Sequence, residues 1–239
     1  MNEKHIVSSF DRDLEGIQAQ IMKMGGMVER AIADAARSLE TRDEELADEV
    51  RRADAAIDAL EEQINEEAAL VIARRAPTAG DLRLVLTVIK ISASLERIGD
   101  YAKNIAKRTA VLTAMTPVNG SPAALRRMAR EVEEMLKDVL DAYIQRDAGV
   151  AQEVIRRDED VDQMYNAIFR EFLTFMMEDP RNITPCMHLH FIAKNIERMG
   201  DLVTAIAEQV IYLVEGRVPD DPRPKGDQTS SDPSISPVF

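Results

Sequence analysis

The sequence predicts an all-α protein in which two similar three-helix bundles, six long helices in all, follow one another along the chain. The composition favours helices, because the 239 residues are 45% hydrophobic, only 4% aromatic, and rich in Ala, Leu, Ile, Met, Glu and Arg. Apolar residues recur at alternating spacings of about three and four, the period of one helix face. An internal repeat of roughly 100 residues then predicts two units of the same build.

The repeat is clearest in a six-residue motif that occurs twice. Residues 95–100 read LERIGD and residues 196–201 read IERMGD, so both copies hold two carboxylates around a glycine. Glycine within a helix costs about 1 kcal/mol relative to alanine, which indicates close approach of another group. Arg42-Asp43 likewise returns as Arg146-Asp147, at an offset of 104 residues rather than the 101 of the motif. We therefore interpret the motif as a duplicated site.

Prolines, glycines and capping residues divide each unit into helices. Pro77 and Gly80 separate the second helix from the third, with Asp81 expected as the N-cap of the third. Further prolines and glycines at 117–122 separate the two units. The expected helices cover 10–42, 44–75 and 81–112 in a first bundle (1–116), and 123–146, 147–177 and 183–214 in a second bundle (117–216).

Charge and composition exclude several classes of protein. The net charge of -13 argues against a nucleic-acid-binding protein, which needs a basic surface. No uncharged run is long enough for a membrane span, and the single Cys186 fits a reducing compartment, so we expect a cytoplasmic protein. Residues 217–239 are rich in Pro, Asp, Ser and Gly and are predicted to form a disordered tail.

The third helix of each unit has an apolar seam beside the motif. The seam residues are Leu84, Val88, Ile91, Leu95, Ile98, Ala102 and Ile105 in the first unit, and Leu189, Ile192, Ile196, Met199, Val203, Ile206 and Val210 in the second. At roughly 100° per residue, Glu96 and Asp100 lie about 40° apart on the flank of the first seam. These two acids therefore border the buried side of the helix.

The second helix carries a matching seam and a row of acids. The seam comprises Leu46, Val50, Ala53, Ile57, Leu60 and Ile64. Asp54, Asp58 and Glu62 flank it at four-residue steps. If the second and third helices form an antiparallel hairpin, Asp58 and Glu62 come near Glu96, and Asp54 comes near Asp100. The sequence therefore predicts a carboxylate cluster between these helices.

Carboxylates that face each other repel unless a positive charge lies between them. An oxygen-rich set suits a hard or borderline metal ion such as Mg²⁺, Mn²⁺ or iron, rather than a structural zinc site. The alternative is that the acids are solvated helix flanks paired with Arg and Lys. The spacing alone favours the solvated flanks, and the duplication together with the glycine brings the metal interpretation level with them.

Several segments resemble the PhoU family of phosphate-signalling regulators. They are Pro77–Arg83 (PTAGDLR), Lys90–Ser92 (KIS) and Glu96–Ala106 (ERIGDYAKNIA), with similar stretches at Glu197–Asp201 and Ile206–Glu208. The resemblance extends over about residues 5–215. It implies a fold of two similar three-helix bundles and metal bound by pairs of E/D-x-x-x-D motifs.

Carried over position by position, the resemblance implies two sets of metal ligands: Asp54, Asp58, Glu96 and Asp100 in the first unit, and Asp158, Asp162, Glu197 and Asp201 in the second. Glu62 and His190 are additional candidates, although a packed role for His190 is favoured because it lies two helical turns before Glu197. In the second unit Asn166 stands where the first has Glu62, which predicts a weaker or different metal site.

The resemblance also implies a function. We expect a non-catalytic adaptor that represses phosphate uptake and the phosphate-starvation response, with the ATPase subunit of a phosphate ABC importer and a sensor histidine kinase as partners. Seams on more than one helix face favour a homodimer. The alternatives are a structural or oligomerising bundle without metal, and a carboxylate-bridged metal enzyme, for which the sequence supplies no general base or oxyanion donor.

Overall fold

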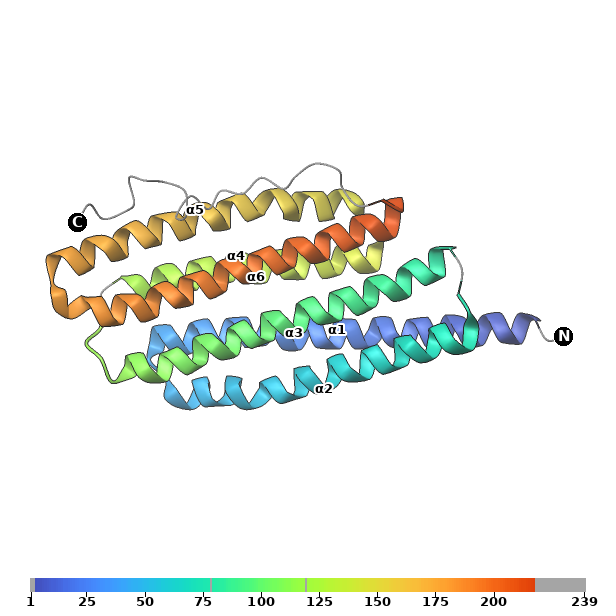
Figure 1. Ribbon diagram of the computed structural model, residues 1–239, viewed down its shortest axis with the longest axis horizontal. Helices are drawn as coiled ribbons and strands as arrows, with labels where there is room; N and C mark the ends of the chain where they lie inside the picture. Colours follow the sequence, from blue (N-terminus) through green and yellow to red (C-terminus); the bar gives the residue numbers. More distant parts are fainter. Residues whose placement is uncertain (1–2, 78, 119, 218–239) are drawn as a thin grey trace.

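The computed structural model describes residues 3–77, 79–118 and 120–217. Six long α-helices make up this part of the chain, which contains no strand (Figure 1). The helices are α1 (Glu3–Thr41), α2 (Glu44–Arg75), α3 (Ala79–Thr113), α4 (Ser121–Gln145), α5 (Ala148–Glu178) and α6 (Ile183–Glu215), and a 3-10 turn, η1 (Pro180–Asn182), precedes α6. The predicted all-α fold of six helices is confirmed.

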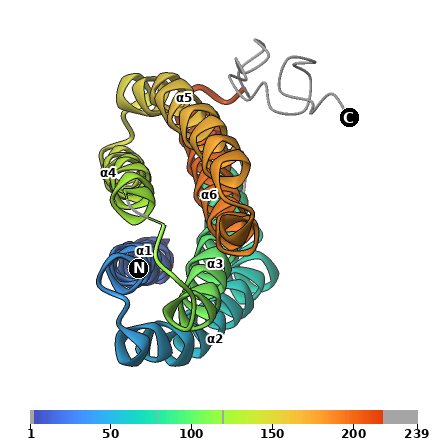
Figure 2. The same ribbon diagram turned by 90° about the vertical axis from the view of Figure 1, so that its left-hand side faces the viewer.

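The helices form two three-helix bundles that lie side by side. Helices α1, α2 and α3 all contact one another in the first bundle, and α4, α5 and α6 all contact one another in the second. The bundles meet through two helix pairs, α3 against α6 and α1 against α4 (Figure 2). Each unit therefore contributes its first and third helices to the interface, while α2 and α5 lie on the outside.

The predicted seams form most of the core. Every seam residue expected on α3 and α6 is buried. On α2 the prediction is wrong for one position, because Ala53 is exposed although its seam neighbours Val50 and Ile57 are buried. Alanine removes little apolar surface from water, so nothing forces this position against a neighbouring helix.

Three helix starts lie earlier than predicted, and for α4 the shift is from near residue 123 to Ser121. Helix α1 begins at Glu3 rather than near residue 10, because no Gly or Pro interrupts residues 3–9. Helix α3 begins at Ala79, so Asp81 lies in its first turn and is not the N-cap. A carboxylate in the first turn still interacts favourably with the positive end of the helix dipole.

The turns between the first two helices of each unit share one design. Asp43 accepts a hydrogen bond from the backbone N–H of Leu46, and Asp147 caps α5 in the same way. The residues before these caps, Arg42 and Arg146, both adopt a positive φ. Arg42 also donates to the carbonyl oxygens of residues 112, 113 and 115 at 2.9, 2.7 and 2.7 Å, so its guanidinium closes the C-terminal end of α3.

Within the described ranges, no helix combines the length and apolar character that a membrane crossing requires. Cys186 is fully buried on α6, which agrees with a core role. The prediction of a disordered tail falls almost entirely on residues 218–239, which lie outside the described part of the chain.

Candidate functional site: two carboxylate clusters

The first cluster lies where α2 crosses the motif on α3. Asp54 is buried on α2, with an exposed fraction of 4%, and faces Gly99, where an added Cβ would lie 3.9 Å from Asp54 Oδ1. Lys103, one turn beyond the motif, donates to Asp54 Oδ2 and also to Asp100 Oδ1 at 3.3 Å. The predicted proximity of Asp54 and Asp100 is therefore present, and an ammonium group bridges them.

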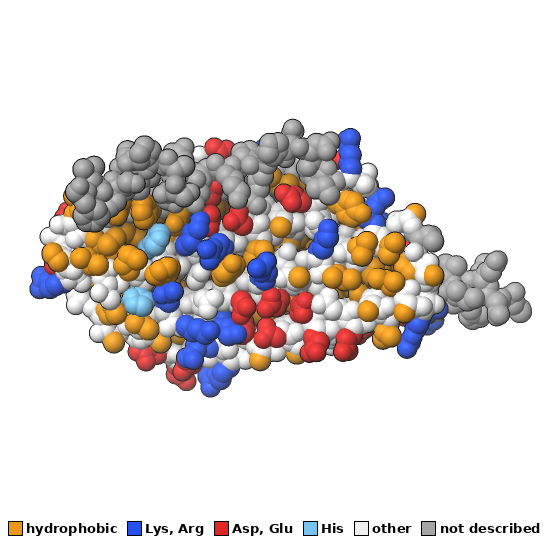
Figure 3. Space-filling view, in the orientation of Figure 1, with side chains coloured by type: hydrophobic (Ala, Val, Ile, Leu, Met, Phe, Trp, Pro, Cys, Tyr) orange, Lys and Arg blue, Asp and Glu red, His pale blue; other side chains and the backbone are white. Residues whose placement is uncertain are grey.

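The charges of the first cluster act on one another. Burial raises the pKa of Glu96 above its usual value, and the neighbouring carboxylates, led by Asp100 and Asp58, raise it further. The pKa of Asp58 is raised by burial and then by Asp54, against a lowering effect of Lys103. Acidic side chains gather near the middle of this face, beside Lys and Arg side chains (Figure 3). The four predicted acids thus form one electrostatic unit with a single lysine among them.

Glu62 does not take the predicted place opposite Glu96. It is exposed, and Glu61 is the acid of that turn whose charge raises the pKa of Glu96. The helix period explains the difference. Each four-residue step from Asp54 through Asp58 to Glu62 turns about 40° further from α3, whereas Glu61, seven residues after Asp54, returns to within about 20° of its direction.

The second cluster repeats this arrangement between α5 and α6, more deeply buried. Asp158, Asp162 and Glu197 are 2%, 5% and 6% exposed, and Asp201 is half-buried. Gly200 lies against Asp158, since a Cβ at residue 200 would lie only 2.9 Å from Asp158 Oδ1. The glycine of each motif therefore makes room for groups on the preceding helix, as its presence within a helix indicates.

A lysine serves the second cluster too, but from another position. Lys194 donates to Glu197 at 2.8 Å, and its ammonium lies 5.0 Å from the ring centroid of Tyr165. At the 101-residue offset, Thr204 stands where the first unit has Lys103. The two units thus place a cation on opposite sides of the same motif, three residues after Asp100 in one and three residues before Glu197 in the other.

His190 is packed among aromatic rings. Its ring lies 6.0 Å from Tyr165, 5.2 Å from Phe169 and 5.9 Å from Phe191, centroid to centroid. This arrangement agrees with the packed role favoured for His190. Tyr165 and Phe169 stand where the first unit has the polar Glu61 and Asn65, so the second unit carries aromatic rings at these two positions of its second helix.

Sequence reasoning missed the two lysines and Glu61. The available signal was the three-residue spacing of Lys103 from Asp100 and of Lys194 from Glu197, which brings side chains together on a helix. Within the part of the chain that the structure describes, no three His, Cys, Asp or Glu side chains are grouped closely enough to surround a metal ion.

The chemistry of the first cluster nevertheless fits a hard cation. Its donors are carboxylate oxygens, and among the described residues the buried Asp54 Oδ1 finds no hydrogen-bond partner. Metal binding therefore stays a prediction, and it would require the carboxylates to gather more closely than they do beside Lys103.

The PhoU domain model matches residues 21–109 and 125–210, which fall within the two bundles. The chain belongs to the PhoU family. It is 45% identical over 240 residues to the phosphate-specific transport system accessory protein PhoU homolog of Rhizobium meliloti, covering 99% of this chain and 100% of that protein. It is 41% identical over 214 residues to PhoU of Escherichia coli, covering 90% and 88%.

Solved PhoU structures share the fold. The crystal structure of PhoU from Pseudomonas aeruginosa superposes with a TM-score of 0.84 at 38% identity, covering 87% of this chain and 100% of that one. The helical pairs that hold both carboxylate clusters are therefore part of a known PhoU architecture.

Proposed function

We propose that this PhoU-family protein is an accessory regulator of phosphate transport, acting as a non-catalytic adaptor that restrains phosphate uptake and the phosphate-starvation response. The observation that carries the proposal is the match over nearly the whole chain to a phosphate-specific transport system accessory protein, at 45% identity. Its partners in this proposal are the ATPase subunit of the importer and a sensor histidine kinase, both at the cytoplasmic side of the membrane.

The carboxylate clusters are the evident candidates for metal binding in this role. Asp54, Asp58, Glu96 and Asp100 would hold a metal in the first unit, and Asp158, Asp162, Glu197 and Asp201 in the second. A bound divalent or ferric ion, with Mg²⁺, Mn²⁺ and iron as the expected choices, would supply positive charge that offsets carboxylate repulsion. The chain's own lysines already supply part of that charge on both helix pairs.

A deletion strain grown in high phosphate tests the regulatory role. We expect phosphate-starvation genes to be expressed in the deletion strain and to be silenced again by the full chain supplied in trans. We also expect importer or kinase components to co-purify with the tagged protein from phosphate-replete cells.

Silent starvation genes in the deletion strain, together with no co-purifying importer or kinase component, would contradict the adaptor role. The structural bundle would then be the better description. A homodimer is compatible with both the adaptor and the structural bundle, and analytical ultracentrifugation of the purified chain measures self-association directly.

A further inference from the structure

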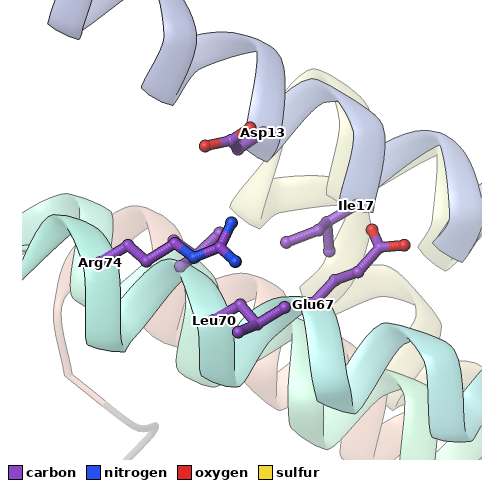
Figure 4. A pocket seen from close by; sticks show the side chains of 6 residues that line it. Asp13, Ile17, Glu67, Leu70 and Arg74 are labelled. Carbon is purple, nitrogen blue, oxygen red and sulfur yellow. The ribbon is translucent and has the colours of Figure 1, made fainter.

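A groove of about 570 Å³ lies between α1 and α2, apart from both carboxylate clusters. Its floor is apolar, and charged side chains from both helices line its rim. The floor comprises Met27, Ala31, Val50, Ala53 and Ile57. A smaller pocket of about 180 Å³ lies further along the same helix pair, where Asp13, Ile17, Glu67, Leu70 and Arg74 face one another (Figure 4). The larger groove is the candidate binding site.

The second bundle provides an internal reference for this groove. Along the first two helices of each unit, residues correspond at an offset of 104, and Arg157 on α5 is the counterpart of Ala53 on α2. Arg157 is half-buried and lies across α4, donating to Glu131 at 2.9 and 2.7 Å and to Asp138 at 2.6 Å. An arginine of the chain itself therefore covers the equivalent surface between α4 and α5.

The first bundle has no such internal cover and keeps only one of the acids that hold Arg157, because Asp34 stands where the second bundle has Asp138. Met27 stands where the second bundle has Glu131, and Arg30 stands where it has Glu134. With Ala53 in place of an arginine, the short side chain leaves the seam position exposed. The open groove is thus a property of the first unit and not of the shared fold.

Charge is distributed unevenly along the groove. Lys23 lies at one end, Asp34 and Glu49 lie toward the other, and Arg30 lies between them, one helical turn before Asp34. Among the described residues Lys23, Arg30 and Glu49 form no ion pair, while Asp34 pairs with Arg37 at the surface at 2.9 Å. At about 1.5 Å of rise per residue, Lys23 and Asp34 are roughly 16 Å apart, which is about three helical turns.

We propose that this groove binds an amphipathic helical segment of a partner protein. Apolar side chains of the segment lie on Met27 and Ala53. Acidic residues near one end of the segment face Lys23 and, further along, Arg30, and a basic residue at the other end faces Asp34 and Glu49. The charge complementarity fixes the direction of the segment, and the short apolar floor supplies the contact area. An interface of this size forms transiently, as in signalling contacts. The proposal does not depend on metal binding or on the identity of the partner.

The test uses the full chain and a fluorescein-labelled helical peptide of about 16 residues, with leucines on one face, two glutamates at one end and two arginines at the other. Fluorescence anisotropy should give a dissociation constant of tens of micromolar. Ala53→Arg fills the groove as Arg157 fills its counterpart, and should weaken binding at least about tenfold. Ala55→Arg adds the same side chain on the far side of α2 and should leave binding unchanged.

Charge reversal provides a second readout. Lys23→Glu with Arg30→Glu should weaken the peptide at least about tenfold, and a peptide with arginines at both ends should recover binding to this variant. Arg127→Glu with Arg130→Glu on α4 is the matched control, with unchanged binding expected. Circular dichroism confirms that every variant is folded.

Three outcomes would overturn the proposal. The first is no binding of the peptide to the wild-type chain at millimolar concentration. The second is equal binding to wild type and Ala53→Arg. The third is self-association that Ala53→Arg abolishes, because a second copy of this chain would then be the occupant. None of these outcomes bears on the phosphate-regulatory role, which the deletion strain tests separately.

Discussion

The two carboxylate clusters arise from one repeated motif, yet their surroundings differ. In the first, Asp54 alone is less than a tenth exposed, whereas in the second Asp158, Asp162 and Glu197 all are. The difference comes from the neighbours of the motif. The buried Tyr165, whose ring lies against the Lys194 ammonium, stands at the position where the first unit has Glu61, whose carboxylate accepts a 2.5 Å hydrogen bond from Asn65. The repeated acids therefore determine which carboxylates lie close together in each unit, and the neighbouring residues determine how exposed those carboxylates are to solvent.

Replacing the lysine of each cluster should give the largest difference in stability between the two units. Lys194→Met leaves Glu197 without its ammonium partner in the drier site and should destabilise the protein by about 3 kcal/mol. Lys103→Met should cost about 2 kcal/mol, because it leaves the buried Asp54 without its ammonium partner while water still reaches Asp58 and Asp100 beside it. Chemical denaturation of metal-free protein measures both changes. A larger loss for Lys103→Met would show that burial does not set the dependence on the cation.

The motif glycines provide the next comparison. Gly200→Ala places a Cβ 2.9 Å from a buried carboxylate oxygen of Asp158, and we expect a loss of about 1–3 kcal/mol from overpacking. Gly99→Ala meets the flexible end of Ile57 at 3.1 Å, where a small shift suffices. Its helix-propensity gain of about 1 kcal/mol should offset most of that strain.

Thermal unfolding of the two alanine variants, side by side, measures this contrast. Equal stability of Gly99→Ala and Gly200→Ala would contradict the close approach of Asp158 to α6.

The smallest expected effect concerns pH at the first cluster. The pKa of Glu96 is raised above 4.5 in the folded protein, so the protonated acid favours the folded state. That contribution is complete below the unfolded pKa and is lost as the pH rises through the folded pKa. Glu96→Gln should therefore melt at a slightly higher temperature than wild type at pH 7 and at the same temperature near pH 4, in the presence of chelator. A lower melting temperature at pH 7 would show that Glu96 is held by a favourable charge.

Much of the fold follows from the sequence because helix periodicity and the repeat report directly on burial. The seams on α3 and α6 are buried as predicted, since Leu, Ile and Val gain from leaving water. Ala53 was placed wrongly because alanine fits a seam pattern whether or not a neighbour covers it. Only the comparison with Arg157 shows why this position is open.

The candidate site was predictable to the level of helix faces and no further. Spacing placed Asp54 near Asp100 and Asp58 near Glu96, but it favoured Glu62 over Glu61, because a four-residue row drifts round the helix. The two lysines were missed because the sequence was searched for clusters of acids and not for basic residues beside them. Lys103 pairs with an acid on its own helix and with one on the preceding helix, and Lys194 pairs with an acid on its own helix. The contact of Tyr165 with Lys194 depends on side-chain directions that sequence spacing does not determine.

The central claim is that both clusters are metal-ion sites, and the metal content of the purified protein tests it most directly. Native mass spectrometry of the full chain, prepared without chelator and equilibrated with Mg²⁺, Mn²⁺ or iron, should show metal bound in both units. Glu96→Ala with Asp100→Ala should remove the first site alone, and Glu197→Ala with Asp201→Ala the second alone, while chelation lowers the melting temperature. Wild-type protein that binds none of these ions, and whose melting temperature is unchanged by chelator, would contradict the claim and leave the acids as helix flanks neutralised by lysine.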